Sequence, residues 1–129
     1  MPLLRFDLIE GRTPAEITTL LDAAHRAMVT AFGVPERDRY QIVHEHSAAH
    51  LIVQNTGLGI ARSEKVVVIT VTSRPRGQQS KLNFYKELCR ELMASCGITP
   101  NDVMVSMVIN SDEDWSFGNA AAQFITGDL

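Results

Sequence analysis

Cysteine is scarce in this chain, which holds only Cys89 and Cys96, and the scarcity argues against a fold held together by disulfides. Both fall in one predicted helix, where a rise of about 1.5 Å per residue sets them roughly 10 Å apart, too far for a disulfide bond. Neither belongs to a CxxC pair or to another metal-binding spacing. We therefore expect two free thiols that pack as small apolar groups.

An excess of positive charge and a long apolar run are also missing. The 12 basic residues are outnumbered by 15 acidic ones, for a net charge of −3, which argues against a nucleic-acid or anionic-membrane partner. No apolar run approaches the length of a membrane span, and the start MPLLRFDLIEGR is too charged for a signal peptide, so we expect a cytoplasmic protein. With 129 residues, the chain is predicted to form one domain over 1–129.

What the chain does contain is a strand-helix-strand pattern that occurs twice. Apolar periodicity, a capping box at TPAE and glycine stops predict six elements: a strand over 3–9, a helix from the capping box at 13–16 to the stop at Gly33, a strand over about 39–46, a strand over 65–72, a helix over about 78–95 and a strand over 103–109. The second helix is expected to bury one face, formed by Leu82, Tyr85, Leu88 and Leu92.

The two halves match one another at a single offset of 64 residues. Gly33 then corresponds to Gly97, and Asp38 corresponds to Asp102. The offset predicts a duplicated unit, with repeat one over about 2–64 and repeat two over about 65–129. Two β-α-β units with right-handed crossovers give an α/β (α+β) fold, in which a four-stranded mixed sheet carries both helices on one face. The run VVVITVT is apolar at nearly every position, which predicts that further copies of the chain cover the other face.

This topology predicts a cluster at one end of the sheet. Parallel strands of one β-α-β unit start at the same end, so Pro2 and Asp38 become neighbours, and antiparallel halves would bring Arg74 and Arg76 of the SRPR loop beside them. A small second residue favours removal of the initiator methionine, which would leave Pro2 with a secondary amine able to act as base, acid or nucleophile. Taken separately, Pro2 could simply begin a strand and the arginines could be surface charge.

Several motifs taken together resemble a known family. These are the Met-Pro start, GVPxxDRYQ, SRPR after the third strand, and DWSFG followed by a phenylalanine and TGDL, and they resemble the tautomerase superfamily and, within it, the malonate semialdehyde decarboxylases. The resemblance covers essentially the whole chain and implies a homotrimer with no metal and no organic cofactor. It implies four catalytic residues, of which the arginines also bind substrate, and an apolar wall: Pro2, Asp38, Arg74 and Arg76, with Trp115, Phe117, Phe124 and Leu129.

The implied activity is decarboxylation of a small β-oxo acid, malonate semialdehyde, to acetaldehyde and CO₂. The electron pair of the breaking bond must enter the neighbouring carbonyl, which Pro2 could assist either as a hydrogen-bonding ammonium or by condensing with the aldehyde. An arginine would hold the carboxylate through its planar guanidinium. Two alternatives stay open: a tautomerase, hydratase or dehalogenating hydratase that uses Pro2 as a proton shuttle, and a non-enzymatic trimeric binding protein.

Three remaining stretches have less specific interpretations. His44, His46 and His50 could be imagined as zinc ligands, but no fourth ligand is evident and a solvated strand edge explains them better. NTGLGIAR has a GxG but no strand before it and no convincing helix after it, so we expect a plain loop rather than a phosphate-binding one. SDEDW is expected to be an exposed turn.

Overall fold

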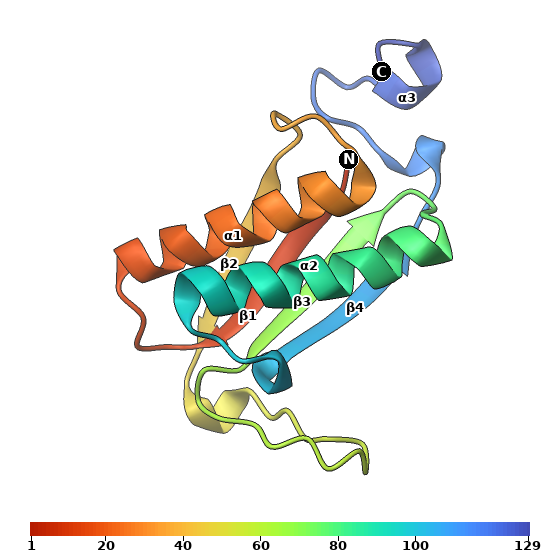
Figure 1. Ribbon diagram of the computed structural model, residues 1–129. Coiled ribbons are helices and arrows are strands. Elements are labelled where there is room, and N and C mark those ends of the chain that lie inside the picture. The colour runs from red at the N-terminus through yellow and green to blue at the C-terminus, as the bar shows by residue number, and fades with distance from the viewer.

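Four strands form one mixed sheet in the computed structural model, which describes residues 1–129 (Figure 1). The main elements are β1 (Leu3–Ile9), α1 (Pro14–Phe32), β2 (Tyr40–His46), β3 (Val67–Ser73), α2 (Gln78–Cys96), β4 (Val103–Ile109) and α3 (Gln123–Thr126), with 3₁₀ turns over Ala48–His50, Pro100–Asp102 and Asp112–Asp114. The strand order is β2-β1-β3-β4. The outer pairs are parallel, and the central β1/β3 pair is antiparallel. The predicted duplicated β-α-β fold is confirmed.

The duplication holds almost residue for residue. Shifting β1 and α1 by 64 residues reproduces the bounds of β3 and α2, while β4 starts one residue earlier than the shifted β2. Both long helices end on a left-handed glycine, Gly33 at φ 63° and Gly97 at φ 66°, a conformation that glycine adopts without strain. The predicted strand over 65–72 is displaced by one or two residues, since β3 spans Val67–Ser73.

The start of α1 follows from its sequence. The Thr13 hydroxyl accepts a hydrogen bond from the Glu16 N–H at 3.2 Å, and the Glu16 carboxylate accepts one from the Thr13 N–H at 2.9 Å. This is the predicted capping box, and Pro14 occupies the first helical turn, where its missing N–H costs nothing. Hydrogen bonding to Thr13, first to its backbone N–H and then to its side chain, lowers the pKa of the Glu16 carboxyl.

The core lies between the two long helices and one face of the sheet. Both repeats contribute helix and strand residues that are at most 1% exposed. These include Leu20, Ala24 and Met28 with Leu4, Phe6 and Leu8, and Phe84, Leu88 and Leu92 with Val67, Ile69 and Val71. The predicted inner face of α2 is therefore wrong in part. Leu82 and Tyr85 are 43% and 37% exposed, because a helix turns about 100° per residue and Phe84 marks the centre of its apolar stripe.

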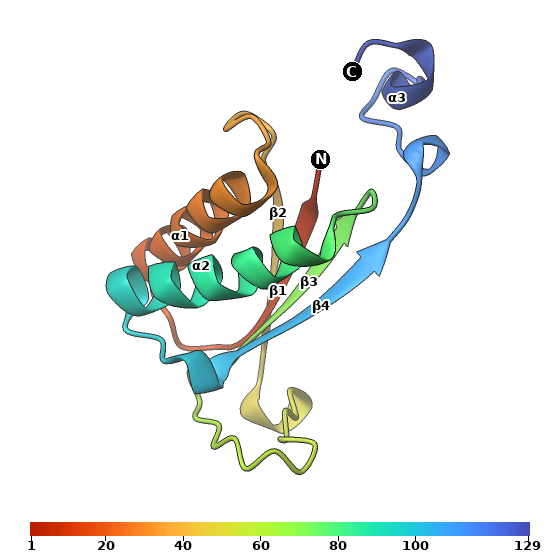
Figure 2. The same cartoon turned by 45° about the vertical axis from the view of Figure 1, so that its right-hand side comes forward.

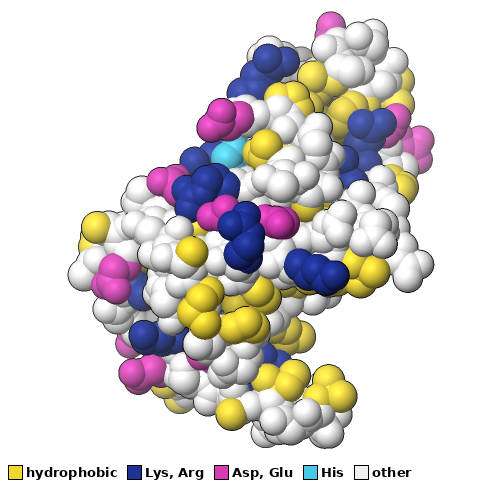
Figure 3. Space-filling view, viewed as in Figure 1, with side chains coloured by type: hydrophobic (Ala, Val, Ile, Leu, Met, Phe, Trp, Pro, Cys, Tyr) yellow, Lys and Arg dark blue, Asp and Glu magenta, His cyan; other side chains and the backbone are white.

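The opposite face of the sheet carries no helix (Figures 1 and 2). Met104 and Val108 on this face are 42% and 51% exposed, so the expected burial of both sheet faces is not reached within one chain. Residues 47–66 project beyond one end of the sheet with apolar side chains on their surface (Figure 3), including Ile52 at 79% exposure. The segment with α3 projects beyond the other end (Figure 2). None of the helices combines the length and apolarity needed to cross a bilayer.

Candidate active site

Two loops, the amino terminus and the C-terminal segment meet around a cavity of about 270 Å³ at one end of the sheet. The sheet register explains the meeting, since Leu3 pairs with Tyr40 of β2 on one side and with Thr72 of β3 on the other. The start of β1 therefore lies between the loop that precedes β2 and the loop that follows β3. Asp38, Arg74 and Arg76 all line this cavity together with the amino-terminal residue Met1.

The amino-terminal amine is surrounded by the charges that the sequence predicts around it. Burial is the largest influence on the amine of Met1 and lowers its pKa; Arg76 and Arg74 lower it further, and Asp38 raises it. Pro2, the next residue, is buried and immediately precedes β1. Loss of Met1 would leave the Pro2 nitrogen as the free amine beside the same three side chains.

Asp38 is a buried carboxylate with an open acceptor. It is 7% exposed, and its backbone N–H donates to the Pro35 carbonyl at 2.9 Å, which closes a turn in the loop. Its Oδ2 atom is buried and accepts no hydrogen bond. Buried polar atoms are nearly always paired in folded proteins, so an unpaired carboxylate oxygen beside a cavity indicates a group kept available for a ligand or for the amine.

The two arginines are held differently. Arg74 donates from Nε to the Asp112 carboxylate at 2.5 Å, and its guanidinium carbon lies 4.1 Å from the centroid of the Phe124 ring. Arg76 donates from Nε to the Ser73 hydroxyl at 3.0 Å, has no carboxylate partner and lies over the Phe32 ring at 5.3 Å. Burial, and then the charge of Arg74, lower the pKa of Arg76. Of these two arginines, Arg76 is thus the one without a carboxylate partner.

The expected apolar wall is only half in contact with the cavity. Phe124 and Leu129 line it, whereas Trp115 and Phe117 do not. Phe117 packs edge-on against Phe124 with ring centroids 5.4 Å apart, and Trp115 stacks on the far side of Phe117 at 5.4 Å. Tyr40, at the start of β2, also contacts Phe117, with centroids 5.6 Å apart. Phe117 therefore packs against Phe124, and Trp115 against Phe117, but neither side chain lines the cavity.

Sequence reasoning missed three contributors to this site. Phe32 ends α1 and lies under Arg76, Arg37 lines the cavity as an exposed side chain, and Asp112 pairs with Arg74. Asp112 lies in the SDEDW stretch, which forms a 3₁₀ turn that is mostly exposed, as predicted, although Asp112 itself is half-buried. Its proximity to Arg74 could not be inferred from spacing, since the two residues are 38 positions apart.

The histidine-rich stretch takes no part in this site. His46 at the end of β2 contacts Asp7 of β1, with Nε2 and Oδ1 2.7 Å apart. This contact lies on the sheet face that carries no helix. No three His, Cys, Asp or Glu side chains of the chain converge in a way that could hold a metal ion.

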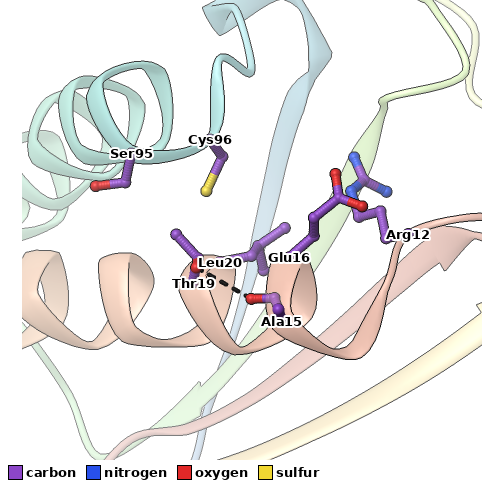
Figure 4. Close-up of a pocket in the computed structure, with 7 residues that line it drawn as sticks. All are labelled: Arg12, Ala15, Glu16, Thr19, Leu20, Ser95 and Cys96. Carbon is purple, nitrogen blue, oxygen red and sulfur yellow. Dashed lines mark hydrogen bonds between the residues drawn. The ribbon is translucent and has the colours of Figure 1, made fainter.

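The duplication creates a second cavity, of about 230 Å³, at the other end of the helices (Figure 4). Arg12, the residue 64 positions before Arg76, lines it together with Glu16 and Cys96. Arg12 donates to the Lys65 carbonyl at 2.7 Å. At the same end, Asp102, the counterpart of Asp38, accepts hydrogen bonds from the Ser63 N–H at 2.7 Å and from its hydroxyl at 2.5 Å.

Comparisons with known proteins agree with this geometry. Two family models, each described as a tautomerase enzyme, match residues 38–118 and 2–61. The probable tautomerase YrdN of Bacillus subtilis (strain 168) is 53% identical over the full length of both chains. A solved malonate semialdehyde decarboxylase is 57% identical, with a TM-score of 0.97 over 98% of each chain. A fused 4-OT described as a symmetric trimer is 28% identical, with a TM-score of 0.78 over 97% of this chain and 98% of the other.

Proposed function

Because the chain belongs to the tautomerase family, we propose that it is a cofactor-free decarboxylase of a small β-oxo acid, with malonate semialdehyde as substrate. The observation that carries the proposal is the convergence of Asp38, Arg74, Arg76 and the amino-terminal amine on one cavity. The similarity to malonate semialdehyde decarboxylase favours this substrate over other small oxo acids.

In the proposed reaction, the bond between the carboxylate carbon and C2 breaks and its electron pair enters the aldehyde carbonyl. Pro2, freed of Met1, assists either as an ammonium that donates a hydrogen bond to the developing enolate oxygen or as an amine that condenses to an iminium with release of one water, which hydrolysis of the product iminium takes up again. Asp38 favours the ammonium form, because a nearby carboxylate raises the pKa of an amine. CO₂ leaves, and C2 takes up one proton to give acetaldehyde.

Arg76 is proposed to bind the substrate carboxylate, since of the two arginines of the SRPR loop it is the one without an acidic partner, and it is less exposed than Arg37, which also lines the cavity. The planar guanidinium restricts the orientation of the carboxylate, so that the breaking bond can align with the carbonyl π-system. Arg74, held by Asp112 and Phe124, completes the clamp. The apolar side chains of Phe124 and Leu129 disfavour the charged carboxylate of the substrate relative to neutral CO₂. They therefore favour the breaking of the bond and not simply the binding of the substrate.

The test is CO₂ release from a panel of small oxo acids that includes malonate semialdehyde and its longer homologues. The matched blank is the chain with Arg74→Ala and Arg76→Ala, which should keep the fold and lose turnover. We expect the wild-type chain, with Met1 removed, to release CO₂ fastest from malonate semialdehyde. A chain that is correctly processed and releases no CO₂ from any β-oxo acid contradicts the proposal.

A second candidate function uses the same groups. The curated relative YrdN is described as a probable tautomerase, which favours proton transfer, and hydratase or dehalogenating hydratase activity would also use Pro2 and the arginines. Titration of the Pro2 amine separates these reactions, because a neutral amine at pH 7 suits a tautomerase and a cationic amine suits decarboxylation or hydration. No feature of the site favours a purely non-enzymatic binding role.

We also propose a homotrimer. The sheet face without helices exposes Met104 and Val108, and burial of such a face by further copies would remove apolar area from water. The trimeric fused 4-OT supports this number of subunits. Sedimentation should give three times the monomer mass, and a stable monomer contradicts the assembly.

A further inference from the structure

His25 lies in the middle of α1, is 5% exposed and takes no part in the proposed chemistry. Its Nε2 atom is 2.6 Å from the backbone carbonyl oxygen of Glu36, in the loop 33–39 that carries Asp38. A carbonyl can only accept, so Nε2 carries the hydrogen and Nδ1 carries the lone pair. That Nδ1 atom is buried without a partner. Together with Oδ2 of Asp38, it makes up the complete set of buried, unpaired side-chain atoms in the chain.

We propose that His25 is a positioning residue for Asp38, because its Nε2–H fixes the Glu36 carbonyl and thereby holds the loop 33–39 against the amino-terminal amine. The proposal rests on the role given above to Asp38. It assigns a function to a polar side chain that a fold selected for stability alone would replace with an apolar one.

The other contacts of the loop explain why an outside anchor is needed. Its backbone makes only short-range hydrogen bonds, from Gly33 N–H to the Val29 carbonyl, from Asp38 N–H to the Pro35 carbonyl and from Arg39 N–H to the Arg37 carbonyl. The Arg39 side chain also pairs with Asp22 of α1 at 2.7 Å, but both side chains of this pair are partly exposed, so it holds the loop only weakly. The His25 imidazole is the only side chain from outside the loop that hydrogen-bonds to the loop backbone between Gly33 and Arg39. It contacts the loop two residues before Asp38, so the anchor does not occupy the carboxylate.

The second repeat shows a different solution at the same place. The residue 64 positions after His25 is Cys89, which makes no hydrogen bond to the loop 97–102. That loop is held from the segment 61–63: Arg62 donates to the Asn101 carbonyl at 2.6 Å, and Ser63 donates to Asp102. Both carboxylate oxygens of Asp102, the equivalent of Asp38, accept hydrogen bonds from Ser63, so neither is left for a ligand. Anchoring through His25 holds the first loop and leaves Oδ2 of Asp38 free.

The position of the loop 33–39 affects the pKa of the amino-terminal amine, because the loop carries the charge of Asp38. The charged groups that face the amine are Asp38, Arg74 and Arg76, and of these only Asp38 raises its pKa. If the loop loses its anchor and the carboxylate moves away, the two arginines dominate and the amine pKa falls. A merely structural role for His25 would lower stability and leave this titration unchanged.

The experiment compares His25→Leu, which removes the donor, with His25→Gln, whose amide nitrogen can reach the Glu36 carbonyl from the position of Nε2. The pKa of the Pro2 amine is measured by ¹⁵N NMR titration of the chain processed at Met1, together with kcat and KM. His25→Leu should lower the amine pKa by about half a unit to one unit. It should also lower kcat about tenfold, with KM changed less than about twofold, because the arginines stay in place. His25→Gln should restore most of both.

Cys89→Leu is the matched control, since it alters the equivalent position of α2 and should leave the amine titration unchanged. Equal losses in His25→Gln and His25→Leu, or no shift of the amine pKa in a folded His25→Leu, overturn the proposal. If His25→Leu does not fold, the imidazole ¹⁵N signals of the wild-type chain decide: a hydrogen on Nδ1 rather than Nε2 overturns it. The amine titration and the imidazole ¹⁵N signals need no substrate, so they test the proposal even if the chain proves not to decarboxylate malonate semialdehyde.

Discussion

Each end of the sheet has an aspartate ahead of a strand and an arginine after another, because the repeat generates the same geometry twice. At one end these are Asp38 and Arg76, and at the other they are Asp102 and Arg12. Asp102 accepts two hydrogen bonds from Ser63, and Arg12 donates to the Lys65 carbonyl. Asp38 keeps an unpaired oxygen and Arg76 has no acidic partner. The same residue types therefore stabilise the fold at one end and remain available for chemistry at the other.

The difference between the ends comes from what lies beside the start of the central strand. At the first end β1 begins next to the chain terminus, and at the second end the equivalent position, Val66, is inside the chain and 3% exposed. An interior peptide nitrogen cannot become an amine. Leaving a carboxylate unpaired in a buried place weakens the fold, and such a cost is typical of sites that bind or react.

The largest difference between the ends is expected for the arginines. Arg76→Ala should lower kcat/KM by about a thousandfold or more, because the substrate carboxylate loses its uncompensated cation. Arg12→Ala should leave kcat/KM unchanged within about twofold, since Arg12 only braces a backbone carbonyl. Steady-state kinetics on both variants checks the comparison. Arg76→Lys should recover little activity, because it keeps the charge without the planar fork.

The aspartates should separate activity from stability. Asp38→Asn should lower kcat about a hundredfold and leave the free energy of unfolding nearly unchanged, since its Oδ2 atom has no hydrogen bond to lose. Asp102→Asn should lower the free energy of unfolding by about 1–3 kcal/mol and leave kcat unchanged, because one of the two buried oxygens that accept hydrogen bonds from Ser63 becomes an amide nitrogen, which cannot accept. Urea denaturation and kinetics of both variants would show this crossed pattern, and its absence would mean that the two ends are not specialised.

A pH profile sharpens the same comparison. If the Pro2 ammonium is the active form, activity is present below the pKa of the amine and is lost as the pH rises through it. Asp38 raises that pKa, so Asp38→Asn should move the alkaline loss of activity to lower pH by about one unit. Asp102→Asn, far from the amine, should leave the alkaline limb where it is. A profile of Asp38→Asn with its alkaline limb unmoved argues against the ammonium.

The support for Arg74 should give a smaller effect. Asp112→Ala removes the carboxylate that accepts from the Arg74 Nε, so Arg74 loses its fixed orientation and KM should rise by about threefold to tenfold with little change in kcat. Both side chains of the pair are partly exposed, so the free energy of unfolding should fall by less than about 1 kcal/mol. A KM equal to that of the wild type would show that Phe124 alone holds Arg74.

Much of the fold could be predicted from local signals. The capping box at Thr13 and the stops at Gly33 and Gly97 act through neighbouring backbone, so they fix helix ends without knowledge of the rest of the molecule. The meeting of Asp38 with Arg74 and Arg76 was also predictable, because it follows from strand direction alone.

The finer pairings were not predictable, because each depends on a side chain brought from elsewhere in the fold. Asp112 reaches Arg74 across 38 residues, and His25 reaches the Glu36 carbonyl from the helix face that packs toward the loop. The inner face of α2 was misjudged at Leu82 and Tyr85, since an amphipathic pattern leaves the centre of its stripe uncertain by a residue or two. The places of Trp115 and Phe117 behind Phe124 depend on how the last residues fold back.

The central claim is that a free amine at Pro2 turns one of two similar ends into an active site. Its most direct test measures CO₂ release from malonate semialdehyde by two preparations of the same chain, one with Met1 removed and one with Met1 retained, each verified by mass spectrometry. The account predicts turnover only where Met1 is removed and the Pro2 nitrogen is an amine. Equal turnover by the chain that keeps Met1 would contradict it.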